Sequence, residues 1–155
     1  MMKHRVTRLV ILLFTIGTTT LLAGSTELPI VIQYRGIIAL PVDFDPEEPV
    51  VVLRTEAEYS SFTADLVDPA DPLAQQPAID FAAHMLVAVL RSGSMEAPHI
   101  MKALNMLGHA VVQTEYPKHV TVPPEGVGSY AAVVISKSKL KVFIQSTHPD
   151  GIPTP

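Results

Sequence analysis

The side chains in this sequence that could do chemistry begin with three regularly spaced histidines. His99, His109 and His119 recur every ten residues, so strands stacked in register could bring them together as metal ligands beside a carboxylate. The chain contains neither H-E-x-x-H nor H-x-H, the spacings that place two imidazoles on one face of an element. Each of the three also borders a turn or a proline, where polar residues are common. A small metal-dependent hydrolase that uses this cluster is therefore kept as the alternative to a non-catalytic protein.

Motifs for nucleophilic catalysis and phosphate binding are missing from the sequence. Ser92, Ser94 and Ser129 lie beside glycines, but no G-x-S-x-G occurs. The GVGS segment at 126–129 lacks the strand-to-helix setting that a phosphate-binding loop requires. Because the chain has no cysteine, thiol catalysis, thiolate zinc sites and disulfides are excluded. We therefore predict no catalytic residue, no metal and no cofactor.

Length and composition favour one folded domain. Apolar residue types make up 48% of the 155 residues and charged types 17%, which is too apolar for a disordered chain. A chain of this length can bury a core of its own. The formal charge of −4 argues against nucleic acid as a partner.

The N-terminus has the pattern of a secretory signal peptide. Residues 1–8 carry three basic side chains and no acid, and residues 9–26 carry no charge. The stretch ends with small residues at Ala23 and Ser25, so we predict that a signal peptide of residues 1–25 is removed by cleavage after Ser25. A retained membrane anchor is the alternative, although 18 residues diluted by glycine and threonine are near the lower limit for a span.

Leu22-Ala23-Gly24 also resembles a bacterial lipobox, but Ser25 stands where the lipidated cysteine would follow, and a hydroxyl cannot form that thioether. Cleavage leaves 130 residues with eight Lys and Arg against 15 Asp and Glu, a formal charge near −7. We expect an exported protein of the periplasm, cell envelope or extracellular space, with no integral membrane span. It would be membrane-anchored if the signal is retained or if Ser25 replaces a native lipidated cysteine.

Turn residues divide the first half of the chain into two strands and one helix. The β-branched run at 30–40 lies between prolines and predicts a strand, with Gly36 at a bulge. After an acidic, proline-rich loop at 43–49, in which Glu47 and Glu48 are interpreted as solvated surface, residues 50–54 predict a second strand. Thr55 and Glu58 form a capping box, and apolar residues at helical spacing extend the helix toward Leu66.

The second half is rich in strands. The unbroken apolar run at 85–90 predicts a strand buried on both faces. Further strands are predicted at 99–107 and 110–116 around a turn at Gly108-His109, and at 130–136 and 140–145, followed by a tail. The fold class is therefore α+β, a mostly antiparallel sheet of six to seven strands with one short early helix.

A segment in the middle of the chain resembles the signature of a known family. Pro77, Ile79, Asp80 and Phe81, then Met85, Val87 and Val89 after a short gap, and finally Gly93 resemble the central motif of the PrcB C-terminal-domain family. That family is named for a subunit of a secreted bacterial protease complex. The resemblance covers about residues 50–145. It divides the chain into an N-terminal strand and loop at 26–49, a PrcB-like domain at 50–148 and a tail at 149–155.

The resemblance implies an exported, non-catalytic accessory or binding domain whose partner is a protease or another envelope protein. The loop after the motif strand is the candidate binding loop, with Arg91, Ser94, Met95, Glu96 and Pro98. It departs from the family pattern, because it keeps Gly93 and Pro98 but lacks the family's glycine pair and aromatic residue. The loop at 117–129 is a second candidate contact region.

Two further features have structural interpretations. Asp80 is expected to accept backbone amides in an Asx turn rather than to serve as a functional carboxylate. Lys137, Lys139 and Lys141 are expected to form a basic ridge that protects an edge strand from aggregation.

Overall fold

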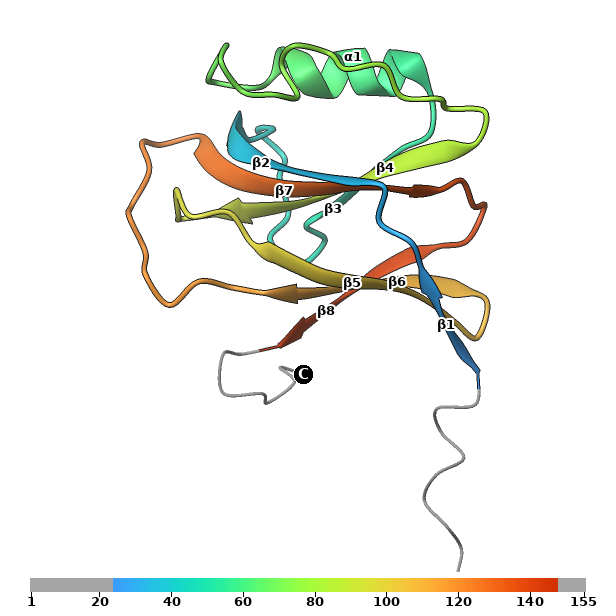
Figure 1. Ribbon diagram of the computed structural model, residues 1–155. Helices are drawn as coiled ribbons and strands as arrows, with labels where there is room; N and C mark the ends of the chain where they lie inside the picture. The colour runs from blue at the N-terminus through green and yellow to red at the C-terminus, as the bar shows by residue number, and fades with distance from the viewer. Residues whose placement is uncertain (1–23, 148–155) are drawn as a thin grey trace, which may run out of the picture.

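Three layers make up the part of the chain that the computed structural model describes, residues 24–147 (Figure 1). One helix covers the upper face of a four-stranded sheet, and a second four-stranded sheet packs against its lower face. We call the sheet with the strand order β2-β7-β4-β3 the middle sheet and the sheet with the order β1-β5-β6-β8 the outer sheet. The elements are β1 (Ser25–Leu28), β2 (Ile32–Ala39), β3 (Val50–Leu53), α1 (Glu56–Ala64), β4 (His84–Ser92), β5 (His99–Met106), β6 (His109–Glu115), β7 (Val127–Ser136) and β8 (Val142–Thr147).

The prediction of an α+β domain with mostly antiparallel strands and one short helix is confirmed in outline. The strand number was wrong, because the described residues contain eight strands in two sheets rather than six or seven in one. Residues 25–28 were missed as a strand because they fall at the end of the predicted signal peptide. They pair with β5, Ser25 opposite Met106.

The middle sheet is buried on both faces, as the apolar run at 85–90 predicts. Alternate side chains of β4 enter two separate cores, because successive residues of a strand point to opposite faces. Leu86, Ala88 and Leu90 pack under the helix. Met85, Val87 and Val89 pack against the outer sheet, and all three are fully buried.

Helix α1 begins where the capping box predicts. Thr55 Oγ1 accepts the Glu58 amide at 3.3 Å, and the Glu58 carboxylate accepts the Thr55 amide at 3.0 Å. The helix ends at Ala64 rather than near Leu66. Leu66 instead forms an antiparallel bridge with Ile38, so the segment after the helix covers the free edge of β2.

Gly36 is not at a bulge, because the β2–β7 register runs unbroken from Ile32 to Ala39. The reason for glycine is space. A Cβ on Gly36 would lie 1.8 Å from Asp71 Oδ2 and 2.8 Å from Tyr130 Cε1. The sequence cannot show this, because Asp71 and Tyr130 are far from Gly36 along the chain.

The β5–β6 hairpin is present, with its turn one residue earlier than predicted. Met106 pairs with His109, so the two loop residues are Leu107 and Gly108. Both have positive φ, 51° and 83°, as a type I′ turn requires. The prediction missed this because leucine is rare in the first position of such a turn.

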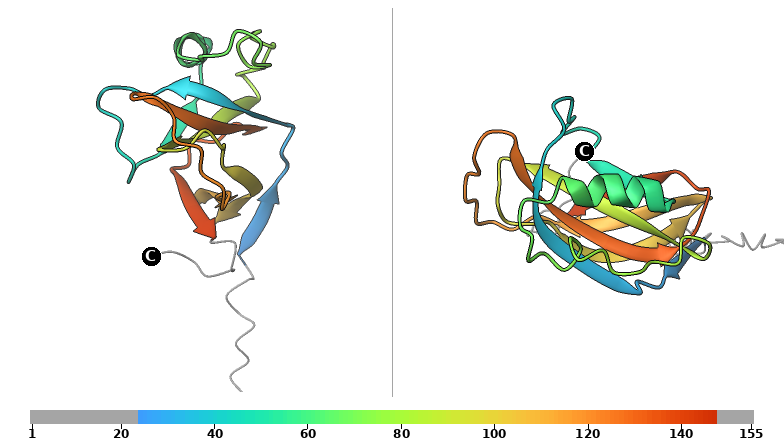
Figure 2. Two further views of the ribbon diagram at one scale, coloured as in Figure 1. Left: turned by 90° about the vertical axis from the view of Figure 1, so that its left-hand side faces the viewer. Right: turned by 90° about the horizontal axis from the view of Figure 1, so that it is seen from above.

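The last two strands belong to different sheets. Strand β7 lies at the centre of the middle sheet, whereas β8 crosses to the outer sheet and pairs with β6 in parallel (Figures 1 and 2). The expected alternation in β8 is confirmed, because Val142 and Ile144 pack into the core while Phe143 is 41% exposed. This crossover leaves β8 at one edge of the outer sheet, beside the open edge of β3.

Candidate functional site

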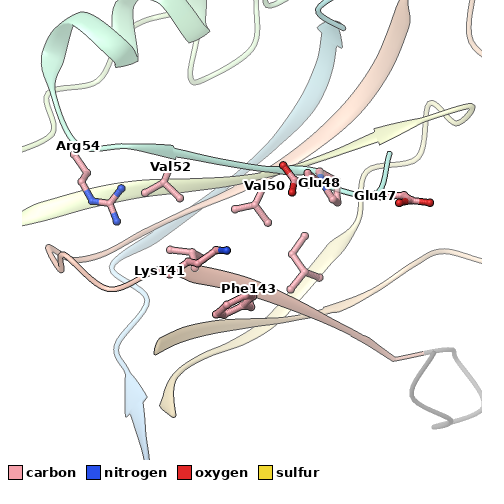
Figure 3. Close-up of a pocket in the computed structure, with 10 residues that line it drawn as sticks. Glu47, Glu48, Val50, Val52, Arg54, Lys141 and Phe143 are labelled. Atoms are coloured by element: carbon pink, nitrogen blue, oxygen red, sulfur yellow. The ribbon is translucent and has the colours of Figure 1, made fainter. Parts of the chain in front are cut away.

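A groove of about 480 Å³ runs between the edge strands β3 and β8 (Figure 3). Its apolar lining comes from both sheets. The residues that line it are Glu47, Glu48, Pro49, Val50, Val52, Arg54, Lys141, Val142, Phe143 and Ile144. Among residues 24–147, no element covers this side of the two stacked sheets, whereas the β2 edge is covered by the segment after α1.

Both edge strands direct backbone groups toward this groove. The Leu90 amide donates to the Pro49 carbonyl at 2.8 Å, so that pair is hydrogen-bonded in the β3–β4 ladder. Because bonding alternates along an antiparallel pair, Val50 and Val52 turn their N–H and C=O groups away from β4. In the parallel β6–β8 pair, the Ala110 amide donates to the Lys141 carbonyl at 3.0 Å. A residue in a parallel pair bonds to the two residues that flank its partner, so the backbone of Val142 points outward. The groove therefore offers donors and acceptors above an apolar floor.

Charge is distributed unevenly along the groove. Glu47 and Glu48 lie at one end and Arg54 at the other, with Lys141 across the groove, immediately before β8 (Figure 3). The Arg54 guanidinium donates to the carbonyls of Ser138 and Leu140, both at 3.0 Å, and so ties β3 to the segment before β8. Lys141 Nζ lies 5.1 Å from the centre of the Phe143 ring. The arrangement suits an occupant with an acidic group at one end and a basic group at the other.

The predicted binding loop at 91–98 uses its polar side chains inside the protein. Arg91 donates to the Glu96 carbonyl at 3.2 Å and lies over the Tyr116 ring at 5.3 Å. Ser94 and Pro98 are buried, and Met95 is half-buried and donates its amide to the Thr121 carbonyl at 2.9 Å. These side chains are therefore used mainly to hold the loop in place and not to contact a partner.

Glu96 is the centre of this arrangement and joins the two predicted loops. Its carboxylate accepts the Thr121 amide at 2.7 Å, the Thr121 hydroxyl at 2.5 Å and the Ser94 hydroxyl at 2.8 Å. The hydrogen bonds from Thr121 and Ser94 lower the pKa of Glu96 to about 2. With Thr121 held in this way, its neighbours Val120 and Val122 are 52% and 81% exposed.

The structure does not bring the three histidines together. His99 pairs with Glu115 at one end of the β5–β6 hairpin and His109 pairs with Met106 at the other, about 20 Å away at a rise of ~3.3 Å per residue. His99 Nδ1 contacts the guanidinium of Arg35, and the His109 ring packs edge-on against Phe143. All three histidines are exposed. Within residues 24–147 no three His, Asp or Glu side chains are grouped as metal ligands.

The residues of the family motif lie in the cores and in the turn before β4. Ile79 and Phe81 pack on the helix-side core, Phe81 with its ring 5.6 Å from that of Tyr59, and the Tyr59 hydroxyl donates to the Pro77 carbonyl. The Asx turn predicted at Asp80 is present, since its carboxylate accepts the Ala82 amide at 2.9 Å. Gly93 has φ of +70° in the exposed turn that follows β4.

A buried carboxylate that the sequence did not reveal lies on the segment after the helix. Asp71 is 4% exposed, and its Oδ1 accepts the Tyr130 hydroxyl and the Leu73 amide, both at 2.8 Å. Burial and the bond to Asp71 raise the pKa of Tyr130. Asp71 stands before a proline, so the sequence predicted only a helix stop. Its partner is 59 residues away, and no local pattern indicates the contact.

The three lysines of the predicted ridge have separate roles. Lys137 donates to the carbonyls of Phe81, at 2.5 Å, and Arg54, at 3.2 Å, and so joins three segments at the β3–α1 junction. Lys139 is exposed, and Lys141 lines the groove beside the edge strand β8. Lys141 alone stands where an edge-protecting lysine is expected.

Within the described residues, no helix has the length and apolarity needed to span a membrane. The predicted signal peptide falls outside these residues, apart from Gly24 and Ser25. Comparison with known proteins found no matching family model, no matching curated protein and no matching solved structure. The resemblance to the PrcB C-terminal-domain family therefore stays a prediction.

Proposed function

We propose that this chain is an exported, non-catalytic binding domain and that its groove between β3 and β8 takes an extended peptide segment of a protein partner. The observation that carries the proposal is the pair of open strand edges facing each other over an apolar floor, with opposite charges at the two ends. An extended chain adds to such an edge through main-chain hydrogen bonds, while alternate side chains enter the floor. The resemblance to a protease-complex subunit makes a protease or another envelope protein the candidate partner.

The chemistry of the groove specifies the peptide. Its centre should be apolar and β-branched, to pack on Val50, Val52 and Val142. An acidic residue should lie near Lys141 and Arg54, and a basic residue near Glu48. Lys141 is the cation available to the peptide, since the Arg54 guanidinium already donates to two carbonyls.

The test is fluorescence anisotropy with labelled peptides that have valine at the centre and opposite charges at the ends. We expect Lys141→Glu and Glu48→Lys each to weaken binding about twofold to fivefold, the size of an exposed ion pair. The variant that carries both changes should prefer a peptide with its end charges exchanged. Glu125→Lys, in an exposed loop outside the groove, is the matched control.

Two results would contradict the proposal. Either no peptide of the set binds the folded protein, or peptides bind and the two groove substitutions change affinity no more than Glu125→Lys does. The histidine-based hydrolase is not proposed, because no observation favours it.

A further inference from the structure

The outer sheet has one face that no described element covers. Its inner face packs on the middle sheet through Ala103, Val112 and Ile144. The alternation of side chains along strands places Leu104, Val111 and Phe143 on the opposite face, as neighbours in the paired register. In Figures 1 and 2 the helix lies on the far side of the molecule from this face.

This outer face is apolar along its middle. Leu104, Val111 and the adjacent Met106 are half-buried, and Phe143 is 41% exposed. Across the sheet this row ends at Glu27, which pairs with Leu104. Along β5 the apolar side chains continue through Met106 to the hairpin tip, where Leu107 is 89% exposed. A leucine with φ of +51° at this position is unusual, because type I′ turns favour Asn, Asp or Gly there. The turn conformation therefore does not explain why a leucine stands at this position, which points to a contact outside the described residues.

The point where the chain enters the outer sheet indicates what that contact is. Ser25 pairs with Met106, and a Cβ on Gly24 would lie 3.8 Å from Leu107 Cδ2. The sequence before this point is uncharged from residue 9 onward. The apolar N-terminal segment thus joins the domain beside the exposed leucine. In the membrane-anchored form of the chain, which is the alternative to cleavage after Ser25, the bilayer that holds this segment lies next to the outer face.

Charge favours the same contact. Of the 15 acidic residues in the chain, only Glu27 and Glu115 lie on strands of the outer sheet. Lys102 is on β5, and Lys141 immediately precedes β8. Side-chain alternation places Glu27 and Glu115 on the outer face together with Lys102, so its charges nearly balance, whereas the acidic excess lies on the loops, the helix and the segment after it. Anionic lipid headgroups therefore repel the outer face less than they repel those parts.

We propose that the outer face, with Leu107 at its tip, rests on the surface of an anionic lipid bilayer. Apolar side chains flanked by lysine are what an interfacial surface requires, because the lysine stems can lie along the apolar region while the ammonium groups reach the headgroups. In this orientation the β3–β8 groove opens to the side of the domain. The proposal does not depend on peptide binding in the groove.

The absence of cysteine makes a direct test possible, because a single introduced cysteine can be labelled uniquely. Leu107→Cys and Val122→Cys are prepared in the full chain, labelled with an environment-sensitive fluorophore and reconstituted with vesicles of phosphatidylcholine and phosphatidylglycerol. Val122 is the matched control, because it is 81% exposed on a loop away from the hairpin tip. We expect nitroxide-bearing lipid to quench the probe at 107 several-fold more than the probe at 122. Equal quenching at the two positions would overturn the proposal.

A second variant tests the face rather than the tip. Val111→Lys places a charge in the middle of the outer face and should reduce quenching at position 107 several-fold, whereas Val67→Lys, at a 51% exposed site after the helix, should not. Circular dichroism checks that both variants fold. Unchanged quenching in folded Val111→Lys would show that the face does not lie on lipid. Protection of position 107 by self-association without vesicles would replace the bilayer with a second copy of the chain.

Discussion

The two sheets of this protein differ in their burial, and the strands of the middle sheet are the richer in apolar residues. Every residue of β4 from Met85 to Leu90 is buried, because the helix covers one face of the middle sheet and the outer sheet covers the other. The outer sheet has one covered face, and its other face exposes part of Leu104, Val111 and Phe143. The same residue types therefore serve as core in one sheet and as surface in the other.

This difference indicates which parts of the molecule stabilise the fold and which parts are available for binding. Burial of both faces makes the middle sheet the structural centre of the domain, so changes there should cost folding free energy. The groove and the outer face lie where no element of the described residues covers the surface. Changes at these places should affect binding more than folding.

The largest expected effect tests this contrast directly. Leu86→Ala removes a fully buried side chain from the helix-side core and should lower the free energy of unfolding by about 2–5 kcal/mol. Leu104→Ala, on the outer face, should cost about 1 kcal/mol or less. Urea unfolding followed by circular dichroism measures both. Equal losses would mean that the outer face is covered in solution and that the contrast between the sheets is wrong.

The next effect concerns the buried carboxylate that links the middle sheet to the segment after the helix. Tyr130→Phe removes the hydroxyl that donates to Asp71 and should cost about 1–3 kcal/mol, because a buried acceptor loses a partner. Tyr34→Phe, which removes a hydroxyl from the same core without breaking that bond, is the control. If thermal unfolding shows the same small loss for both variants, the Asp71 bond does not hold this segment in place.

At the surface, the Glu96 carboxylate should hold the two loops in a pH-dependent way. Because its pKa is lowered from 4.5 to about 2 in the folded state, its contribution to stability is complete above about pH 4.5 and is lost as the pH falls through about 2. The Thr121 amide should therefore stay protected from hydrogen exchange at pH 4 and lose protection near pH 2. In Glu96→Gln this protection should be weak at both pH values. A Glu96 pKa near 4.5, measured by NMR titration, would show that the loops are not joined in this way.

The smallest expected effect is a change in the free energy of unfolding when Leu107, at the exposed tip of the β5–β6 hairpin, is replaced. Leu107→Asn should raise the free energy of unfolding by about 0.4–1 kcal/mol, because Asn-Gly suits a turn in which both central residues have positive φ. Leu107→Val should lower it, since β-branched residues fit that conformation poorly. Thermal unfolding of the two variants measures the difference. If asparagine destabilises the protein, Leu107 contributes to packing within the domain and is not kept there for an outside contact.

Patterns within a few residues of one another predicted much of the fold. The capping box located the start of α1, the apolar run at 85–90 identified the doubly covered strand, and alternation identified the inner side chains of β8. The predictions were wrong where a local pattern had two solutions. Gly36 was assigned to a bulge, whereas its missing side chain leaves space for Asp71.

The candidate site was much harder to predict. The loop residues at 91–98 were chosen from a motif, yet Arg91, Ser94 and Glu96 bond within the protein. Glu47 and Glu48 were interpreted as solvated surface, and both are exposed, but the sequence did not show that they also line the groove. Their neighbours in the groove come from residues about 90 positions later, and no local pattern shows which strand edges remain uncovered.

By itself, the sequence determined the types of the elements, the absence of thiol chemistry and the acidic character of the chain, because these depend on composition and on contacts between near neighbours. Only the tertiary structure decided that β8 crosses to the outer sheet beside β3, that Asp71 meets Tyr130 and that Leu107 lies beside the start of β1. Each of these depends on which distant segments pair. That choice is made by the burial of whole faces and not by any single residue.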